Sequence, residues 1–527
     1  GHTLTIARYA SIHVAEGAKV RLGSGNGNDL KICGVRNEQS NDGPGLLHIK
    51  GTCEMYPGVS LSGREGNNYF GGGVTVEGGT FHMHGGEIKN CGIRGGSVCY
   101  GGGVAVYYGG KFIMDGGEIK DCYADSDASI YFNHPLGFTG VGGGVFVSGG
   151  SSFVMNGGTI SNNKATSMGG GIAVVASYEE ISRGFGNLKS SVEIKGGTVK
   201  NNSAQTGAGV FASASYYCPV YAICAQTPAI GQSANPGLYI DNAQILDNVA
   251  PISSKDKDVK HPNKKDHPAY GMGGGVFVAG LNSPAGVRIS NTTIQGNKAA
   301  VGGGFAAKQN TYDGQLTITN TVLCNNIAER AASDVYLDHA PLNLPSAEAM
   351  NAFYSGEPGD VKGRKIDGWY IDEETSRYTA QTNEQRTKYK DYANIGGTGK
   401  VYLIAAAKLP LAKITFKDED GNVIYAESWH PHGTPAHQIR VPKAQKASDD
   451  TYDYIFEAWR PEIKDVTEHA TYTAIFKRVF KKFNAKYEFN SVSDGERLPD
   501  EVKALLPADT TDYRHEENIT AIAPPKT

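Results

Sequence analysis

Residues 71–100 read GGGVTVEGGTFHMHGGEIKNCGIRGGSVCY, and residues 101–125 repeat the pattern as GGGVAVYYGGKFIMDGGEIKDCYAD. Each copy opens with a glycine triplet, and short segments follow in which apolar residues alternate with other residues between glycine pairs. This alternation predicts very short β-strands with one buried face. A strand of three or four residues cannot bury that face alone, but copies stacked ~4.8 Å apart would bury all of them in one core.

The same unit recurs along most of the chain. Glycine triplets start at residues 71, 101, 142, 169, 273 and 302, and a Gly-Ala-Gly copy occupies residues 207–209. The shortest repeats run 27 to 30 residues from triplet to triplet, below the ~40–45 residues of a propeller blade and much longer than a hexapeptide. We therefore expect an all-β chain in which residues 1–340 form a parallel β-helix, a solenoid of stacked coils.

Aligned repeats place an Asn at one turn position and an Ala two residues later. A stacked Asn column can hydrogen-bond along the solenoid and saturate buried turn backbone. In two earlier coils Cys91 and Cys122 take the Asn position, within disulfide reach of each other, although we favour two small buried thiols. The columns are Asn163, Asn202, Asn248, Asn297 and Asn326, and Ala124, Ala165, Ala204, Ala250, Ala299 and Ala328.

This pattern resembles the pectin-lyase-like right-handed parallel β-helices, in particular the Gly-Gly-Gly-rich versions of Gram-positive surface adhesins. The resemblance covers residues 1–340. It implies an extracellular location and says little about the ligand.

The C-terminal part changes character. The motifs FKDEDGNV (416–423), FEAW (456–459) and VTEHATYTA (466–474) make residues 413–480 similar to an internalin-type B repeat, a small β-grasp-like surface module. YEFNSVSDGERLPDEVKALLPADTTDY (487–513) resembles the start of a SHIRT domain over residues 486–527. Residues 341–412 between them are expected to cap the helix and connect it to these modules. Both resemblances imply a protein attached to the cell wall through a region C-terminal to this sequence.

The charge balance limits the partners. Lys and Arg total 50 against 54 Asp and Glu, a net charge of −4, which provides no field for nucleic acid or an anionic membrane. No stretch approaches the ~20 apolar residues of a membrane helix, so we expect no membrane segment.

Four insertions interrupt the repeat, at residues 125–141, 177–190, 213–237 and 251–272. They fall at two places in the repeat on neighbouring coils, so they should form one rim that is rich in aromatic residues. Flat rings beside charged groups suit sugar recognition, although the same rings could instead pack the loops onto the helix. The expected carbohydrate-binding residues are Tyr131, Phe132, His134, Tyr178, Glu179, Arg183, Tyr216, Tyr217 and Tyr221.

Catalysis would need two carboxylates, and Asp241 with Asp247 is the best candidate pair. The alignment also supports an ordinary role, because Asp241 neighbours Lys195 and Asp115 neighbours His84, as cross-strand charge pairs would. Asp247 falls in a column filled by Asn on other coils.

No cofactor or metal is expected. Asp125 with Asp127 and Asp256 with Asp258 are only weak Ca²⁺ signals, and His261 and His267 do not have a metal-ligand spacing. We favour a non-enzymatic, carbohydrate-binding surface adhesin. The alternative is a glycoside hydrolase or polysaccharide lyase that uses a carboxylate pair on the β-helix face.

Overall fold

A computed structural model divides the chain into two compact units, Gly1–Leu411 (unit 1) and Ala412–Thr527 (unit 2). It describes residues 2–523 apart from 8–9, 25–29, 35–44, 67–69, 95–98, 126–139, 176–189, 214–236, 252–270, 280–286, 309–315, 351–365, 367, 379–394, 397–398, 407–410, 432–433, 489–499 and 515–516.

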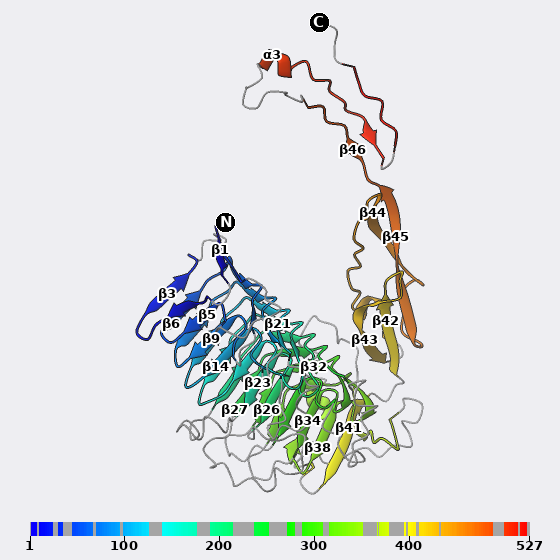
Figure 1. Cartoon of the computed structure of the whole chain (residues 1–527). Helices are drawn as coiled ribbons and strands as arrows, with labels where there is room; N and C mark the ends of the chain where they lie inside the picture. Colours follow the sequence, from blue (N-terminus) through cyan, green and yellow to red (C-terminus); the bar gives the residue numbers. More distant parts are fainter. Residues whose placement is uncertain are drawn as a thin grey trace, which may run out of the picture. The chain divides into compact units, whose positions relative to one another are not determined.

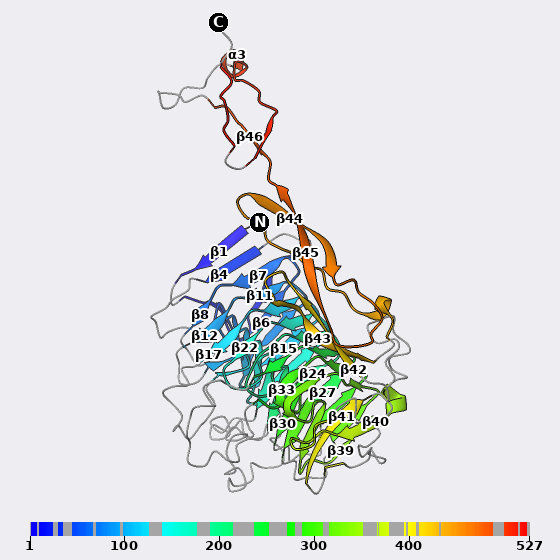
Figure 2. The same cartoon turned by 90° about the vertical axis from the view of Figure 1, so that its right-hand side faces the viewer.

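Unit 1 is a parallel β-helix, as the repeat predicts (Figure 1). Three long sheets, which we call A, B and C, run along the solenoid. A typical coil passes through one strand of sheet B, then one of sheet C and one of sheet A, and then through a shorter ladder before the next glycine triplet. Equivalent strands of successive coils pair in parallel, for example Val104 with Val74 and Phe112 with Phe81. Figure 2 shows β1, β4, β7 and β11 of sheet A in one row and β8, β12, β17 and β22 of a short ladder in another.

The strands of the three long sheets are very short. Sheet A contains β1 (His2–Ile6), β4 (Leu30–Gly34), β7 (Val59–Ser62), β11 (Glu87–Lys89), β16 (Glu118–Lys120), β21 (Thr159–Ser161), β25 (Thr198–Lys200), β28 (Gln244–Leu246), β32 (Thr293–Gln295) and β36 (Val322–Leu323). Sheet C contains β3 (Lys19–Leu22), β6 (Thr52–Met55), β10 (Thr80–Met83), β15 (Lys111–Met114), β20 (Ser152–Met155), β24 (Ser191–Ile194), β27 (Gly237–Asp241), β31 (Val287–Ser290), β35 (Leu316–Thr319) and β39 (Leu342–Asn343). Sheet B contains β2 (Ile12–Val14), β5 (Leu47–Ile49), β9 (Val74–Glu77), β14 (Val104–Tyr107), β19 (Val145–Val147), β23 (Ile172–Val175), β26 (Val210–Ser213), β30 (Val276–Ala279), β34 (Phe305–Lys308), β38 (Val335–Asp338), β41 (Lys400–Ala406) and β40 (Gly368–Ile371).

Short ladders complete the coils. They are β8 (Glu65–Gly66), β12 (Gly92–Arg94), β17 (Tyr123–Asp125) and β22 (Lys164–Ala165), then β29 (Val249–Ala250), β33 (Lys298–Val301) and β37 (Ile327–Ala331), and the pair β13 (Cys99–Tyr100) and β18 (Gly140–Val141).

The core lies inside the coils. Phe81, Phe112 and Phe153 are fully buried and stack with ring centroids 5.2 and 4.7 Å apart, close to the spacing between strands. The glycine triplets permit this stacking in two ways. Gly71 has a φ of +64°, which favours glycine, and a Cβ on Gly73 would lie 2.6 Å from the carbonyl oxygen of Gly103 on the next coil.

The predicted Asn column is confirmed. Its members are at most 3% exposed. The Oδ1 atoms of the last four members accept from the backbone nitrogen and Nδ2 of the Asn one coil earlier, and Asn163 Oδ1 accepts from the backbone nitrogen of Cys122 at 2.9 Å. Asn248 Oδ1, for example, accepts from the backbone nitrogen and Nδ2 of Asn202, both at 3.0 Å. The Ala column is also buried. Cys91 and Cys122 are buried free thiols, as favoured above.

An acidic residue ends the Asn ladder. Asp334 Oδ1 accepts hydrogen bonds from the backbone nitrogen of Asn326 at 3.0 Å and from its Nδ2 at 2.9 Å, which is the pattern that each Asn forms with the next. Beyond this coil the chain direction changes, because β41 pairs antiparallel with β38 and with β40.

Unit 2 contains a mixed four-stranded sheet in the order β43-β42-β45-β44. Its strands are β42 (Leu411–Lys417), β43 (Val423–Pro431), β44 (Tyr452–Arg460) and β45 (Ala470–Phe480). The predicted turn at Asp420-Gly421-Asn422 joins β42 to β43, and Gly421 has a φ of +87°. The remaining elements are a 3-10 helix (Ala436–Gln438), β46 (Phe483–Asn484), α3 (Asp500–Lys503) and β47 (Asp512–Tyr513).

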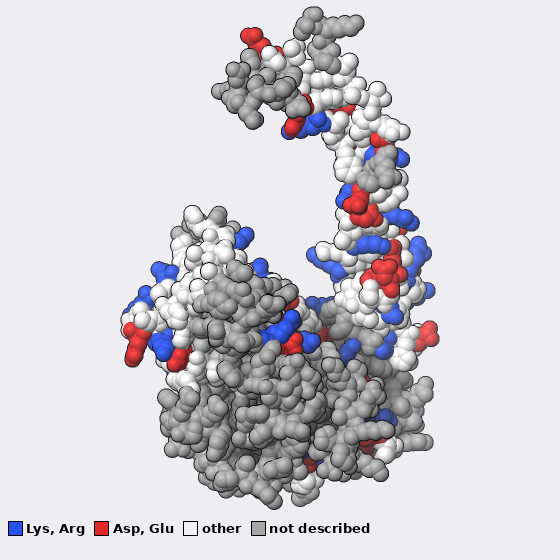
Figure 3. Space-filling model, in the orientation of Figure 1, with Lys and Arg blue, Asp and Glu red and all other residues white. Residues whose placement is uncertain are grey.

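Within the residues described, no helix is long and apolar enough to cross a membrane. In Figure 3, basic and acidic atoms lie interspersed over the described surface of unit 2.

Candidate functional site on the outer face of sheet C

Sheet C has a mostly polar strip on the side that points away from the core, interrupted by Ile113 and Val154. Phe81 and Met83 of β10 are fully buried, whereas His82 and His84 alternate with them and are partly exposed. The same alternation on neighbouring strands defines what we call the outer face of sheet C. Its polar members include Arg21, Glu54, Tyr56, His82, His84, Asp115, Asn156, Glu193, Lys195, Tyr239, Asp241, Arg288 and Ser290.

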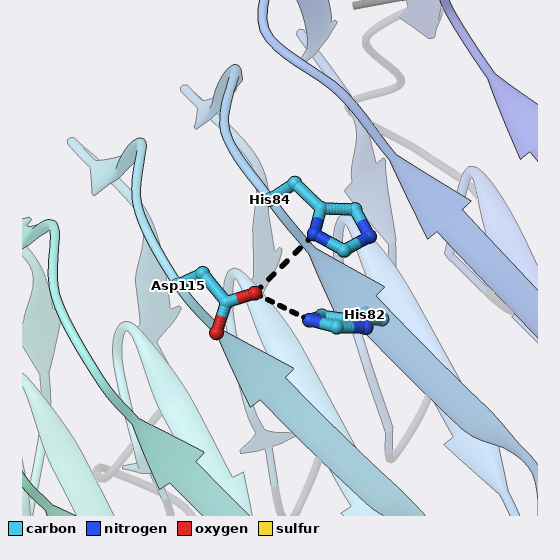
Figure 4. A group of neighbouring side chains, drawn as sticks. All are labelled: His82, His84 and Asp115. Atoms are coloured by element: carbon cyan, nitrogen blue, oxygen red, sulfur yellow. Dashed lines mark hydrogen bonds and ion pairs between the residues drawn. The ribbon is translucent and has the colours of Figure 1, made fainter.

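Two imidazoles converge on one carboxylate of this face (Figure 4). His82 lies on β10, His84 follows directly after it, and Asp115 follows the neighbouring strand β15. Asp115 Oδ2 is 2.6 Å from His82 Nε2 and 3.3 Å from His84 Nδ1. The ring centroids of the two histidines are 3.8 Å apart. We call these three residues the His-Asp cluster.

Asn156, one strand further along, holds the other oxygen of the carboxylate. Its Nδ2 donates to Asp115 Oδ1 at 2.8 Å. Burial alone would raise the pKa of Asp115, but the hydrogen bonds from Asn156 and His82 and the charges of the two imidazoles bring this pKa below its usual value. The cluster therefore keeps a negatively charged oxygen between two ring nitrogens.

An aromatic ring borders the cluster on its other side. Tyr56 stacks on His84 with centroids 4.6 Å apart, and the guanidinium of Arg21 lies 4.2 Å from the centroid of the Tyr56 ring. The Tyr56 hydroxyl donates to Glu54 at 2.8 Å, which lowers the pKa of Glu54, and the nearby imidazoles and Arg21 lower it further. Acidic, basic and aromatic groups thus lie side by side on three neighbouring strands.

Asp241 lies further along the same face, where sequence reasoning expected it to neighbour Lys195. The register is as expected, since Ile194 pairs with Ile240. The ion pair does not form. Asp241 accepts hydrogen bonds from Ser290 at 2.7 Å and Asn291 at 2.8 Å, and Lys195 pairs at 2.8 Å with Glu193 of its own strand.

Asp247 occupies a turn position. Its φ is +56°, as in the Asn residues that fill this column on other coils, and its backbone nitrogen donates to Gln295. Asp and Asn tolerate this left-handed conformation better than most residues. Asp241 ends β27 and Asp247 follows β28, so the turn residues Asn242 and Ala243 and the three residues of β28 separate them along the chain.

The outer face of sheet B contrasts with that of sheet C. From β14 to β30 its strands are buried on both sides, and the outward-pointing rings of Phe211 and Phe277 stack 5.7 Å apart. These outward residues form a second apolar cluster with residues that precede the glycine triplets, such as Tyr100, Met168 and Met272. This side of the solenoid is therefore covered.

All nine carbohydrate-binding residues expected on the rim, from Tyr131 to Tyr221, lie outside the described residues. So do Asp127, Asp256, Asp258, His261 and His267. The described strands show where the insertions attach. Two follow the short-ladder strands β17 and β29, and two follow β23 and β26 of sheet B.

Residues 481–526 match the SHIRT domain. No curated protein and no solved structure matches the chain. The SHIRT match lies entirely in unit 2, so it places the chain among surface-associated bacterial proteins without describing the β-helix. The resemblances of residues 1–340 and 413–480 stay predictions.

Sequence reasoning missed the His-Asp cluster, although its signal was present. His82 and His84 are two residues apart in a strand, which places both on one face, and the aligned repeat puts Asp115 beside His84. The pair of Asp115 with His84 was expected, but the contribution of His82 to the same oxygen was not.

Proposed function

We propose that this surface-associated bacterial protein is an adhesin, held at the cell wall, whose β-helix binds carbohydrate. The observation that carries the proposal is the outer face of sheet C. It is a partly exposed strip that offers hydrogen-bonding side chains on successive strands, on the same solenoid whose sheet B is buried on both faces from β14 to β30.

Several properties of this face suit a glycan. Strands ~4.8 Å apart repeat their polar groups at a spacing comparable to one sugar ring, so an extended chain could contact several coils. Tyr239 provides a partly exposed ring on which the C–H face of a sugar can stack, whereas the Tyr56 ring already packs between His84 and Arg21. Glu54, Asp115, Asn156 and Asp241 offer oxygens and an amide to hydroxyl groups. The insertions 177–190 and 213–237 connect strands of sheet B to strands of sheet C along the chain, and their aromatic residues are the other expected carbohydrate-binding positions.

Binding without cleavage is favoured over hydrolysis. Asp241 ends β27 of sheet C, Asp247 follows β28 of sheet A, and Asp241 already accepts hydrogen bonds from Ser290 and Asn291. A glycosidase needs two carboxylates ~5–9.5 Å apart across a bond of the substrate. The expected resemblance to adhesive β-helices agrees with this preference.

The proposal is tested by screening the full chain on an array of host and plant glycans. Glycans that bind are then incubated with the protein overnight and examined for products by mass spectrometry. We expect binding of intact glycan that weakens about tenfold or more in Tyr239→Ala or Tyr178→Ala, since each removes an aromatic ring on which a sugar can stack. Tyr454→Ala in unit 2 is the matched control and should bind as the wild type does.

Two outcomes would contradict the adhesin. Glycan cleavage that is lost in Asp241→Asn or Asp247→Asn would make the protein an enzyme. Absence of binding to every glycan class by the folded full chain would remove carbohydrate as the ligand.

A further inference from the structure

We propose that His82, His84 and Asp115 bind a divalent transition-metal ion of the Zn²⁺ type on the outer face of sheet C. Within the part of the chain that the structure describes, these side chains form a group whose ligand atoms all lie within 4.8 Å of one another. Two imidazole nitrogens and one carboxylate oxygen are donors that Zn²⁺ and its neighbours in the first transition row accept.

The backbone creates the arrangement before any ion is present. His82 and His84 alternate with buried Phe81 and Met83, so both rings leave β10 on the same side. Parallel pairing in register then sets Asp115 beside His84 on the neighbouring coil. Ligands held by a rigid sheet need little ordering when the ion binds, which favours affinity.

The distances fit an ion after a small adjustment. In a tetrahedral site with metal–ligand bonds of 2.0–2.1 Å, two ligand atoms of the same ion lie about 3.3 Å apart. Asp115 Oδ2 is already 3.3 Å from His84 Nδ1. Its 2.6 Å distance to His82 Nε2 would open by less than an ångström, through rotation of side chains that are about a quarter to a third exposed.

Outer residues orient the ligands. Asn156 engages Asp115 Oδ1 at 2.8 Å and leaves Oδ2 directed at the two imidazoles (Figure 4). The ring of Tyr56 lies against His84 and limits its rotation. Such second-layer contacts are typical of metal sites and fix the ring or carboxylate that binds the ion.

The surrounding charge is mixed. Glu54 lies opposite His82 in the register of β6 with β10, and it adds a negative charge on the side of the cluster away from Asp115. The positive charge of Arg21 contacts Tyr56, beyond the ligands themselves. With three protein ligands, a fourth position would be left for water or for a ligand oxygen, as in zinc sites that act on a bound molecule.

A second histidine–carboxylate pair provides a matched control. His48 Nε2 lies 2.7 Å from Glu77, but that carboxylate also pairs with Lys50 at 3.2 Å. An ammonium group already neutralises Glu77, so His48→Gln should leave metal binding unchanged.

The test uses the full chain without an affinity tag and titrates it with Zn²⁺ in a calorimeter. We expect one ion to bind in wild type and in His48→Gln, and to be lost in His82→Ala, His84→Ala and the double variant. Asn156→Ala should weaken binding about 10–100-fold, since it removes only the residue that orients Asp115. Circular dichroism of each variant checks that the solenoid is intact.

Cobalt absorption separates this site from the cysteines. Co²⁺ bound by nitrogen and oxygen shows visible bands without the near-ultraviolet charge transfer of a thiolate ligand. We expect that spectrum, and its loss in the His82→Ala, His84→Ala double variant. Thiolate bands, unchanged affinity in the folded double variant, or no ion bound by wild type would each overturn the metal site. None of these results depends on carbohydrate binding.

Discussion

The outer faces of sheets B and C belong to the same coils, yet one is covered and the other is open. On the coil formed by β26 and β27, the outward Phe211 is fully buried whereas the outward Tyr239 is partly exposed. Inward positions of both strands pack in the same core. The inward residues thus build the solenoid, and the outward residues decide which side stays exposed.

The largest expected difference in stability comes from replacing one outward side chain on each face with alanine. Phe211→Ala should lower the free energy of unfolding by about 3–5 kcal/mol, because it leaves a cavity beside Phe277 within the second apolar cluster. Tyr239→Ala should cost less than about 1 kcal/mol, as expected of a partly exposed side chain. Chemical denaturation monitored by circular dichroism measures both, and equal losses would mean that the two faces do not differ.

The Asn ladder supports both faces and should be nearly as sensitive. Asn248→Ala leaves the backbone nitrogen and Nδ2 of Asn202 without their acceptor and the carbonyl of Val199 without its donor, all in a buried turn. We expect a loss of about 2–4 kcal/mol in the same measurement. Asn248→Ser keeps a polar side chain and serves as the milder comparison. A loss below about 0.5 kcal/mol in Asn248→Ala would show that the ladder contributes little.

Two carboxylates extend the comparison to pH. Asp115 on the open face has a lowered pKa, whereas burial raises the pKa of Asp334 to about 7 despite its hydrogen bonds from Asn326 and Ala405. Because the Asp334 carboxyl holds its proton more tightly in the folded state than in the unfolded chain, it stabilises the fold fully below pH ~4, near its unfolded pKa. This stabilisation is lost as the pH rises to its folded pKa of about 7. This contribution changes by at most about 1.4 kcal/mol per pH unit. In Asp334→Asn that part of the pH dependence of unfolding should vanish, and an unchanged slope would show that Asp334 is ionised throughout.

The smallest effect is expected for Asp241→Asn. The amide oxygen can still accept from Ser290 or Asn291, and the side chain is partly exposed. We expect a change within about 0.5 kcal/mol in the free energy of unfolding. A loss of several kcal/mol would mean that Asp241 is a structural residue and would remove it from the binding surface.

The repeat made most of unit 1 predictable from its sequence, because glycine spacing and alternation fix which residues point inward. Asn248 and its column follow from the same alignment. The end of the ladder could not be predicted from the alignment. Asp334 occupies the position that a glycine triplet fills in other coils, yet its side chain forms the hydrogen bonds of the Asn that the next coil lacks.

Side-chain partners on the open face were harder to predict than the register. Lys195 lies beside Asp241 as aligned, but its long flexible chain reaches Glu193 two residues away instead. The alternation of the repeat does not show what covers Phe146 and Phe211 on the outward side of sheet B, because the residues that pack on them precede the glycine triplets and belong to another part of the coil.

Hydroxyl-radical footprinting of the native full chain, read by mass spectrometry, measures the exposure of individual side chains and tests the contrast between the two faces most directly. We expect Tyr56, His82, His84 and Tyr239 to be oxidised readily, and Phe146, Phe211 and Phe277 to be protected until the protein unfolds. Similar oxidation of both groups in the folded protein would contradict the assignment of sheet C as the open, ligand-binding side of the solenoid.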